Sequence, residues 1–158
     1  MKRKRIMLIG PRGSGKSTLA NVLNAEDRPL RQTQDTIYRK YTLDVPSGYL
    51  ENSWMYQHLI ALSQDAWCIL VLVDGSKRTE VYSPGFAKTF RCPVVGVISK
   101  CDLCSEGVTQ AEKELAKIGV RPPYFAISAK SGEGLERLIT YLKQLEGGKG
   151  VYEIYHRE

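Results

Sequence analysis

The stretch "RIMLIGPRGSGKST", residues 5–18, predicts how this chain begins to fold. It opens with a continuous apolar run, which is typical of a strand that is covered on both faces of a sheet. A glycine-rich loop follows the run, and a segment of helical character follows the loop. Gly10, Gly15, Lys16 and Ser17 fit the pattern G-x-x-x-x-G-K-[ST] in this strand–loop–helix context. The stretch therefore predicts a phosphate-binding loop, or P-loop.

The residue types of this loop suit the phosphates of a nucleotide. Gly13 and Gly15 allow backbone N–H groups to turn inward around phosphate oxygens. The amino terminus of the helix adds a partial positive charge, and Lys16 can reach the β- and γ-phosphates. The Ser17 hydroxyl is the predicted ligand of a Mg²⁺ ion. The predicted nucleotide contacts of the loop are Gly10, Gly13, Ser14, Gly15, Lys16, Ser17 and Thr18.

Apolar runs like the first one recur along the chain, at intervals long enough to hold a helix. The predicted strands are "RIMLIG", "WCILVLVDG", "PVVGVISK" and "PYFAIS", and the predicted helices are 16–25, 51–63, 84–89, 109–118 and 134–146. Within residues 31–45 polar and apolar side chains alternate, which predicts an antiparallel hairpin or an edge strand. The whole order predicts an α/β fold with a mostly parallel central sheet and helices on both faces.

The totals fit one ordinary globular domain. The chain has 158 residues, of which 42% are hydrophobic and 25% charged. We expect the domain to occupy residues 1–150, with a short tail at 151–158. No apolar run approaches the roughly 20 residues of a spanning helix, so we expect a cytoplasmic protein without a membrane segment. The net charge is +6, and basic residues crowd into the opening "MKRKR". Since no aromatic-rich binding motif accompanies them, a solvated flank is favoured over nucleic-acid binding.

Two later segments predict which base the bound nucleotide carries. "VVGVISKCDL" places Ser99, Lys100 and Asp102 at the end of a buried strand, close to the pattern N-K-x-D. A carboxylate at Asp102 can accept hydrogen bonds from both guanine N1–H and N2–H₂, which adenine does not offer. "FAISAKSGEG" adds Ser128, Ala129 and Lys130 at another strand end, where a backbone N–H can meet guanine O6. The order of these segments resembles that of a Ras-like GTPase and predicts GTP or GDP as the ligand.

The stretch "LDVPSGYLEN", residues 43–52, resembles the switch segment of a nucleotide-binding protein, but with other residues at two of its positions. Asp44 suits a water-mediated contact with Mg²⁺. Ser47 replaces the glycine of Asp-x-x-Gly, and a backbone angle that requires glycine would be strained there. Gly48 stands where Ras-like proteins keep a water-positioning glutamine. The switch threonine that would complete the Mg²⁺ site is Thr33 or Thr36, and Thr33 is favoured because its "TQ" resembles that of a family of small P-loop proteins.

Arg12 is unusual, because many GTPases keep a small residue at that point of the loop. It either acts as a built-in arginine finger or crowds the γ-phosphate, and crowding is favoured since a finger needs accurate placement. Lys16 and Arg12 are therefore the candidate catalytic residues. Without a glutamine at Gly48, GTP hydrolysis should be slow.

A closer resemblance comes from "TQDTIYRKYTLDVPSGYLEN" and "YSPGF", together with the P-loop and "VVGVISKCDL". These segments resemble the ethanolamine-utilisation EutP and propanediol-utilisation PduV family of small P-loop proteins. The resemblance implies a GTPase-like fold, nucleotide binding, and association with the shell or a cargo protein of a bacterial microcompartment. It also leaves acetate-type phosphoryl transfer open.

Three functions are consistent with these residues. The first is a guanine-nucleotide-binding protein that hydrolyses GTP slowly. The second is a small-molecule kinase that phosphorylates acetate through the same loop, with Arg12 and Arg31 as its candidate cationic clamp. The third is a recruitment module in which the bound nucleotide is structural and is not hydrolysed.

Overall fold

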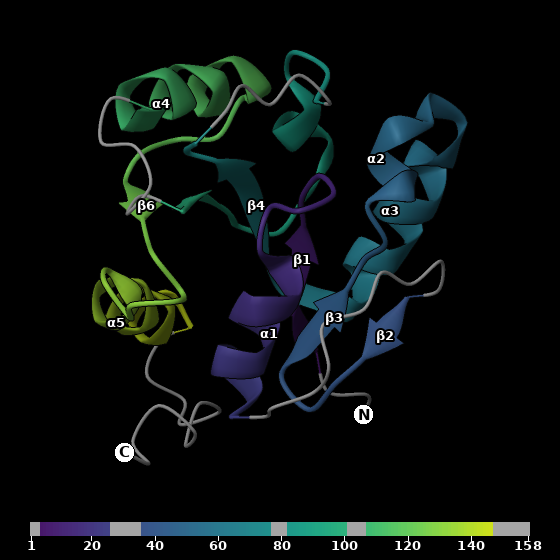
Figure 1. Ribbon diagram of the computed structural model, residues 1–158. Helices are drawn as coiled ribbons and strands as arrows, with labels where there is room; N and C mark the ends of the chain where they lie inside the picture. Colours follow the sequence, from purple (N-terminus) through teal and green to yellow (C-terminus); the bar gives the residue numbers. More distant parts are fainter. Residues whose placement is uncertain (1–3, 26–35, 77–81, 101–106, 147–158) are drawn as a thin grey trace.

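The computed structural model describes residues 4–25, 36–76, 82–100 and 107–146. They build a six-stranded sheet with the strand order β2-β3-β1-β4-β5-β6 (Figure 1). All neighbouring strands pair in parallel except β2 and β3, which are antiparallel. The strands are β1 (Arg5–Ile9), β2 (Ile37–Tyr38), β3 (Thr42–Asp44), β4 (Ala66–Asp74), β5 (Val94–Ser99) and β6 (Tyr124–Ala126).

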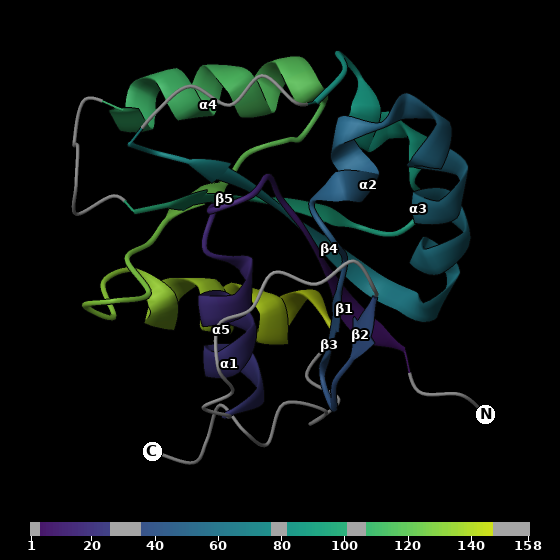
Figure 2. The ribbon, with the colours of Figure 1, turned by 45° about the vertical axis from the view of Figure 1, so that its right-hand side comes forward.

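Helices cover both faces of this sheet, as Figures 1 and 2 show. On one face lie α1 (Lys16–Asn24) and α5 (Leu135–Leu145); on the other lie α3 (Tyr56–Leu62) and α4 (Gly107–Ile118). The remaining helical segments are α2 (Gly48–Glu51) and the 3-10 helices η1 (Ser53–Met55), η2 (Ser63–Asp65) and η3 (Phe86–Thr89).

The first strand shows why the apolar runs of this chain are continuous. Ile6 and Leu8 pack with the α1 and α5 side of the sheet, whereas Met7 and Ile9 pack with the α3 and α4 side. Successive side chains of a strand point to opposite faces, so a strand that is covered on both faces needs apolar residues at every position. All four of these side chains are fully buried.

Most predicted elements are confirmed, and one predicted helix is wrong. The four apolar runs form β1, β4, β5 and β6, and the predicted hairpin is β2–β3. The single helix expected over 51–63 is instead three pieces, α2, η1 and α3. Asn52 adopts an extended conformation (φ −122°, ψ 109°), and its side-chain amide donates to the carbonyl of Gly48 at 3.0 Å. This interaction ends α2, since Asn side chains often compete with a helix for backbone groups.

Strand order places the candidate site. From β1 the chain passes through α1 to β3 on one side and later reaches β4 on the other side, so the order reverses at β1. Open α/β sheets bind ligands outside the carboxyl ends of their strands at such a reversal. The P-loop leaves β1 at that point, and Asp44 ends the neighbouring strand β3.

Candidate functional site

A cavity of about 390 Å³ lies at the carboxyl ends of β1 and β3, beside the amino terminus of α1. It brings together the P-loop, the end of the hairpin, the segment after β3 and the end of β5. Its lining residues are Pro11, Arg12, Gly13, Ser14, Gly15, Lys16, Ser17, Thr18, Ile37, Asp44, Val45, Pro46, Ser47 and Lys100. Segments far apart in the sequence therefore meet at one site.

The loop after β1 has the shape that its glycines predict. Gly13 and Gly15 have φ values of 76° and 91°, in the left-handed region that favours glycine. A Cβ atom at Gly10 would lie 2.5 Å from the Ser14 hydroxyl oxygen, so the loop also needs glycine there. This Ser14 hydroxyl is buried and has no hydrogen-bond partner among the described residues. A buried polar atom without a partner fits a loop that is completed by a phosphate ligand.

Lys16 is the first residue of α1 and faces back over the loop. Its ammonium donates to the carbonyl oxygen of Gly10 at 2.5 Å. Burial lowers the pKa of Lys16 to about 8, although the carboxylates of Asp44 and Glu51 act in the opposite direction. The site therefore holds a poorly solvated cation, which an anionic ligand would stabilise.

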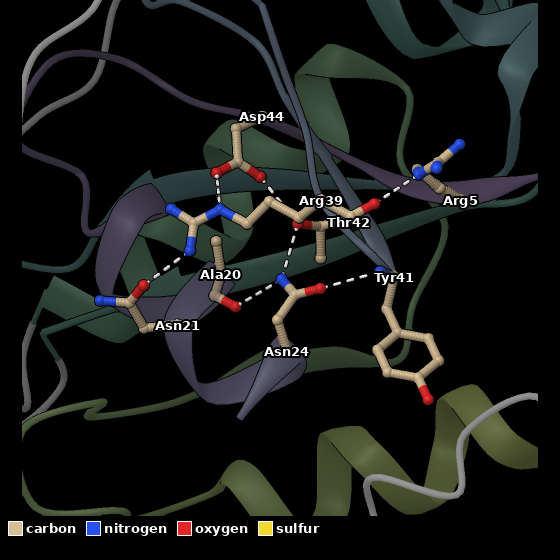
Figure 3. A network of polar contacts seen from close by, with 8 residues as sticks. All are labelled: Arg5, Ala20, Asn21, Asn24, Arg39, Tyr41, Thr42 and Asp44. Atoms are coloured by element: carbon tan, nitrogen blue, oxygen red, sulfur yellow. Dashed lines mark hydrogen bonds and ion pairs between the residues drawn. The ribbon is translucent and has the colours of Figure 1, made fainter. Parts of the chain in front are cut away.

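Asp44 reaches the same cavity from the end of β3, where its carboxylate is buried in a polar network (Figure 3). Arg39 donates from Nε to Asp44 Oδ2 at 2.7 Å, and the Thr42 hydroxyl donates to Asp44 Oδ1 at 2.8 Å. Arg39 was not among the site residues predicted from the sequence. The available signal was a basic residue within the alternating hairpin, but only the register of β2 and β3 brings Arg39 to Asp44.

Lys100 enters the cavity from the end of β5, where it has a left-handed backbone (φ 58°). Its ammonium lies 3.3 Å from Asp74 Oδ2, and Asp74 Oδ1 accepts a hydrogen bond from the Ser76 N–H at 2.8 Å. Burial by itself raises the pKa of Asp74, but the hydrogen bonds from Ser76 and the charge of Lys100 lower it below its usual value. Asp74 was also missed from the sequence, although it ends a strand that pairs with β5.

Among the described residues, the other predicted base-contacting residues do not line the cavity. Ser99 is buried, its hydroxyl donates to the Val73 carbonyl at 3.2 Å, and its Cβ lies 3.9 Å from where a Cβ of Gly15 would be. Ser128 is buried in a turn, and Ala129 and Lys130 continue that turn. Gly10 contributes its carbonyl behind Lys16. Asp102, Thr33 and Arg31 lie outside the described residues.

The switch segment has an ordinary backbone. Ser47 has φ −60° and ψ −29° and precedes the first residue of α2, so the strain expected at a glycine replacement is absent there. A Cβ atom at Gly48 would meet no heavy atom within 4 Å, which leaves room for a side chain. Arg12 is exposed and lines the cavity, so its side chain lies at the entrance.

Two features are absent from the residues that the structure describes. No group of three or more His, Cys, Asp or Glu side chains could hold a metal ion in that part of the chain. Among the same residues, no helix is both long and apolar enough to cross a bilayer.

Residues 3–144 match the family model described as ethanolamine utilisation and propanediol utilisation, PduV–EutP. The chain belongs to the PduV–EutP family. It is 32% identical over 144 residues to the propanediol utilization protein PduV of Citrobacter freundii, a match that covers 90% of this chain and 95% of that protein. It is 31% identical over 160 residues to the probable acetate kinase EutP of Escherichia coli, covering 94% and 98%.

Solved structures confirm the P-loop GTPase fold of this PduV–EutP protein. Elongation factor SelB of Methanococcus maripaludis with a GTP analogue superposes with a TM-score of 0.65 at 19% identity, over 92% of this chain and 34% of that one. The probable GTP-binding protein EngB superposes with a TM-score of 0.64 at 22% identity, over 89% and 97%. The predicted α/β architecture is thus confirmed, together with the family.

Proposed function

We propose that this PduV–EutP protein binds GTP and GDP together with Mg²⁺ and hydrolyses GTP slowly. The observation that carries the proposal is the cavity, where the P-loop, Asp44 and Lys100 line one space. Its lining includes the Lys16 cation and the Ser14 hydroxyl, which has no hydrogen-bond partner among the described residues. The lining also includes Lys100, two residues before the predicted guanine acceptor Asp102.

Each residue in this proposal has a separate role. Lys16 and the backbone N–H groups of the loop bind the β- and γ-phosphates. Ser17, Asp44 and Thr33 are the residues that would hold Mg²⁺, directly or through water. The ion would neutralise charge on the phosphate oxygens when it is bound. Ser47 offers a backbone N–H near the γ-phosphate, while Gly48 has no side chain to orient an attacking water.

We expect guanine nucleotides to bind at least roughly 100-fold more tightly than adenine nucleotides. The reason is that adenine offers no hydrogens at the positions of guanine N1–H and N2–H₂, so it would leave the Asp102 carboxylate without hydrogen-bond donors. The measurement is a titration of the purified protein with GDP, GTP, ADP and ATP in the presence of Mg²⁺. Asp102→Asn should shift the preference toward xanthine nucleotides, whose donor and acceptor pattern suits an amide. Equal binding of ATP and GTP by the unmodified protein would contradict the proposal.

We expect isolated protein to hydrolyse GTP at about 10⁻⁴ to 10⁻³ s⁻¹, the rate of an unassisted Ras-like protein. Single-turnover assays should compare the unmodified chain with Arg12→Ala and Gly48→Gln. A Cβ atom at Gly48 would meet no heavy atom within 4 Å, and a glutamine there should raise the rate if water orientation is limiting. If Arg12 acts in cis, the unmodified rate rises toward about 10⁻² s⁻¹ and Arg12→Ala abolishes the gain. A rate near about 1 s⁻¹ would contradict the proposed switch.

A second candidate reaction is phosphoryl transfer to acetate. Two observations favour it: the name of the EutP relative, and an exposed arginine, Arg12, on the cavity wall. The test is to follow acetyl phosphate and inorganic phosphate in parallel, with and without acetate. Acetyl phosphate that forms only when acetate is present would identify the kinase. Tight nucleotide binding without either product would identify a recruitment module.

We further propose that the protein associates with the shell or cargo of a bacterial microcompartment. The support is membership of a family described by ethanolamine and propanediol utilisation. A fluorescent fusion, imaged in cells that make such shells, should co-localise with them. Deletion of residues 2–5 and, separately, of 151–158 would show whether either end is the attachment segment. An intact fusion that stays diffuse would refute the association.

A further inference from the structure

The carboxylate of Asp44 forms an ion pair with a cationic side chain of the protein, that of Arg39. Arg39 lies in the turn of the β2–β3 hairpin, and its side chain is 4% exposed. It donates to Asp44 at 2.7 Å and to the Asn21 side-chain oxygen on α1 at 2.6 Å (Figure 3). Its backbone carbonyl also accepts a hydrogen bond from Arg5 on β1. Arg39 therefore ties the hairpin to α1 and to the neighbouring strand.

The second carboxylate oxygen of Asp44 is held by a chain of hydrogen bonds. Thr42 donates to Asp44 Oδ1, and Asn24 donates from its amide to the Thr42 hydroxyl oxygen at 2.8 Å. The Asn24 side-chain oxygen accepts from the Tyr41 backbone N–H at 2.8 Å, and the same amide nitrogen contacts the Ala20 carbonyl at 2.7 Å. Both oxygens of Asp44 thus have protein partners, although the residue lines the cavity.

We propose that Arg39 competes with Mg²⁺ for the Asp44 carboxylate and so sets how strongly the cavity takes the ion; the proposal rests on the proposed function in assigning Asp44 to Mg²⁺. A guanidinium stays charged at any ordinary pH, so the pair cannot be relieved by loss of a proton. A divalent cation next to Asp44 repels Arg39 at short range, where solvent screens little.

This competition has a consequence for the fold. When Mg²⁺ approaches Asp44, the Arg39 contact weakens, and the β2–β3 hairpin loses part of its attachment to α1. β3 stays paired with β1, whereas β2 is a two-residue edge strand that pairs with β3, so the part that loosens is β2 and the turn. Arg39 is therefore a positioning residue that links ion binding at the cavity to the state of the hairpin.

The first test needs no nucleotide. Thermal unfolding is followed against MgCl₂ for the unmodified chain, Arg39→Gln, Lys40→Gln and the double variant Arg39→Gln with Asp44→Asn. Arg39→Gln should respond to Mg²⁺ at a concentration roughly tenfold lower than the unmodified chain, since one charge next to the ion is removed. Lys40→Gln makes the same charge change at an exposed neighbour and should shift the response less than about twofold. The double variant should lose the response.

An unchanged or weaker Mg²⁺ response in Arg39→Gln, or an equal gain in Lys40→Gln, would overturn the inference. Should Arg39→Gln fail to fold, the unmodified protein supplies the second measurement. The NMR signal of the Arg39 Nε–H should be protected from exchange without Mg²⁺ and lose protection when MgCl₂ is added. A signal that MgCl₂ leaves unchanged would also overturn it. Because both arms use Mg²⁺ alone, a failure to bind guanine nucleotides, seen in the titration above, is a separate result.

Discussion

Lys16→Met is expected to weaken nucleotide binding by roughly two to four orders of magnitude, because it removes charge-assisted hydrogen bonds of about 1.5–3 kcal/mol each to two phosphates. The Lys16 side chain is half-buried at the cavity, and its ammonium donates to the loop carbonyls of Gly10 and Pro11. Titration with a fluorescent GDP analogue measures the loss. Lys113→Met, on the exposed side of α4, is the matched control and should bind as the unmodified chain does.

The pKa of Lys16 gives this prediction a second readout. In the free protein burial lowers the pKa of Lys16 to about 8, below its ordinary value of 10.5, and a bound phosphate should raise it again. Nucleotide affinity should therefore fall as the pH rises above about 8, and binding there should take up a proton. Calorimetry at pH 8.5 in buffers of different ionisation enthalpy detects that uptake, which Lys16→Met should lack.

The lowered pKa of Lys16 also predicts how the free energy of unfolding changes with pH. Between about 8 and 10.5 the unfolded chain keeps the Lys16 proton while the folded protein has lost it. The free energy of unfolding in the absence of nucleotide should then increase with pH across this window, relative to Lys16→Met. Affinity that is independent of pH from 7 to 10 would show that Lys16 does not titrate in this range.

Gly134→Ala is expected to lower the free energy of unfolding by about 2–5 kcal/mol. Gly134 precedes α5 with φ 79°, and a Cβ there would lie 2.2 Å from the Ala126 carbonyl oxygen. The left-handed backbone costs about 1–2 kcal/mol for a residue with a side chain. The overlap with a strand carbonyl adds roughly 1–3 kcal/mol, because β6 must shift to relieve it.

The same turn contains a control for this effect. Gly132 also has a positive φ, 87°, but a Cβ at that position would meet nothing within 4 Å. Gly132→Ala should therefore lose only the backbone contribution, about 1–2 kcal/mol. Urea unfolding of both variants measures the difference. Equal destabilisation by the two substitutions would show that the close approach of Gly134 to β6 does not contribute.

The layout of this fold could be predicted because its strongest signals are local. The run before Gly10 is apolar at every position, and a strand buried on both faces requires that pattern. The P-loop glycines predict their own backbone conformation, and Gly13 and Gly15 have it. Predicted helices were less accurate where a side chain competes with the backbone, as at Asn52, which ends α2.

The candidate site was predicted only in part, for a physical reason. Sequence motifs locate residues that act through their own position along the chain, such as Lys16 at the start of a helix. They do not show which charges face each other across strands. Asp74 reaches Lys100 only because β4 and β5 pair in parallel with Asp74 opposite Ser99.

Sequence patterns were enough to predict the P-loop, the order of the strands and most helices, and the family of the chain. These depend on spacing within short segments, where neighbouring residues impose each other's geometry. The pairing of Asp44 with Arg39, in a buried network that ends on α1, is seen only in the folded protein. That pairing depends on the register of the hairpin and on the packing of α1 against β3, which no local pattern encodes.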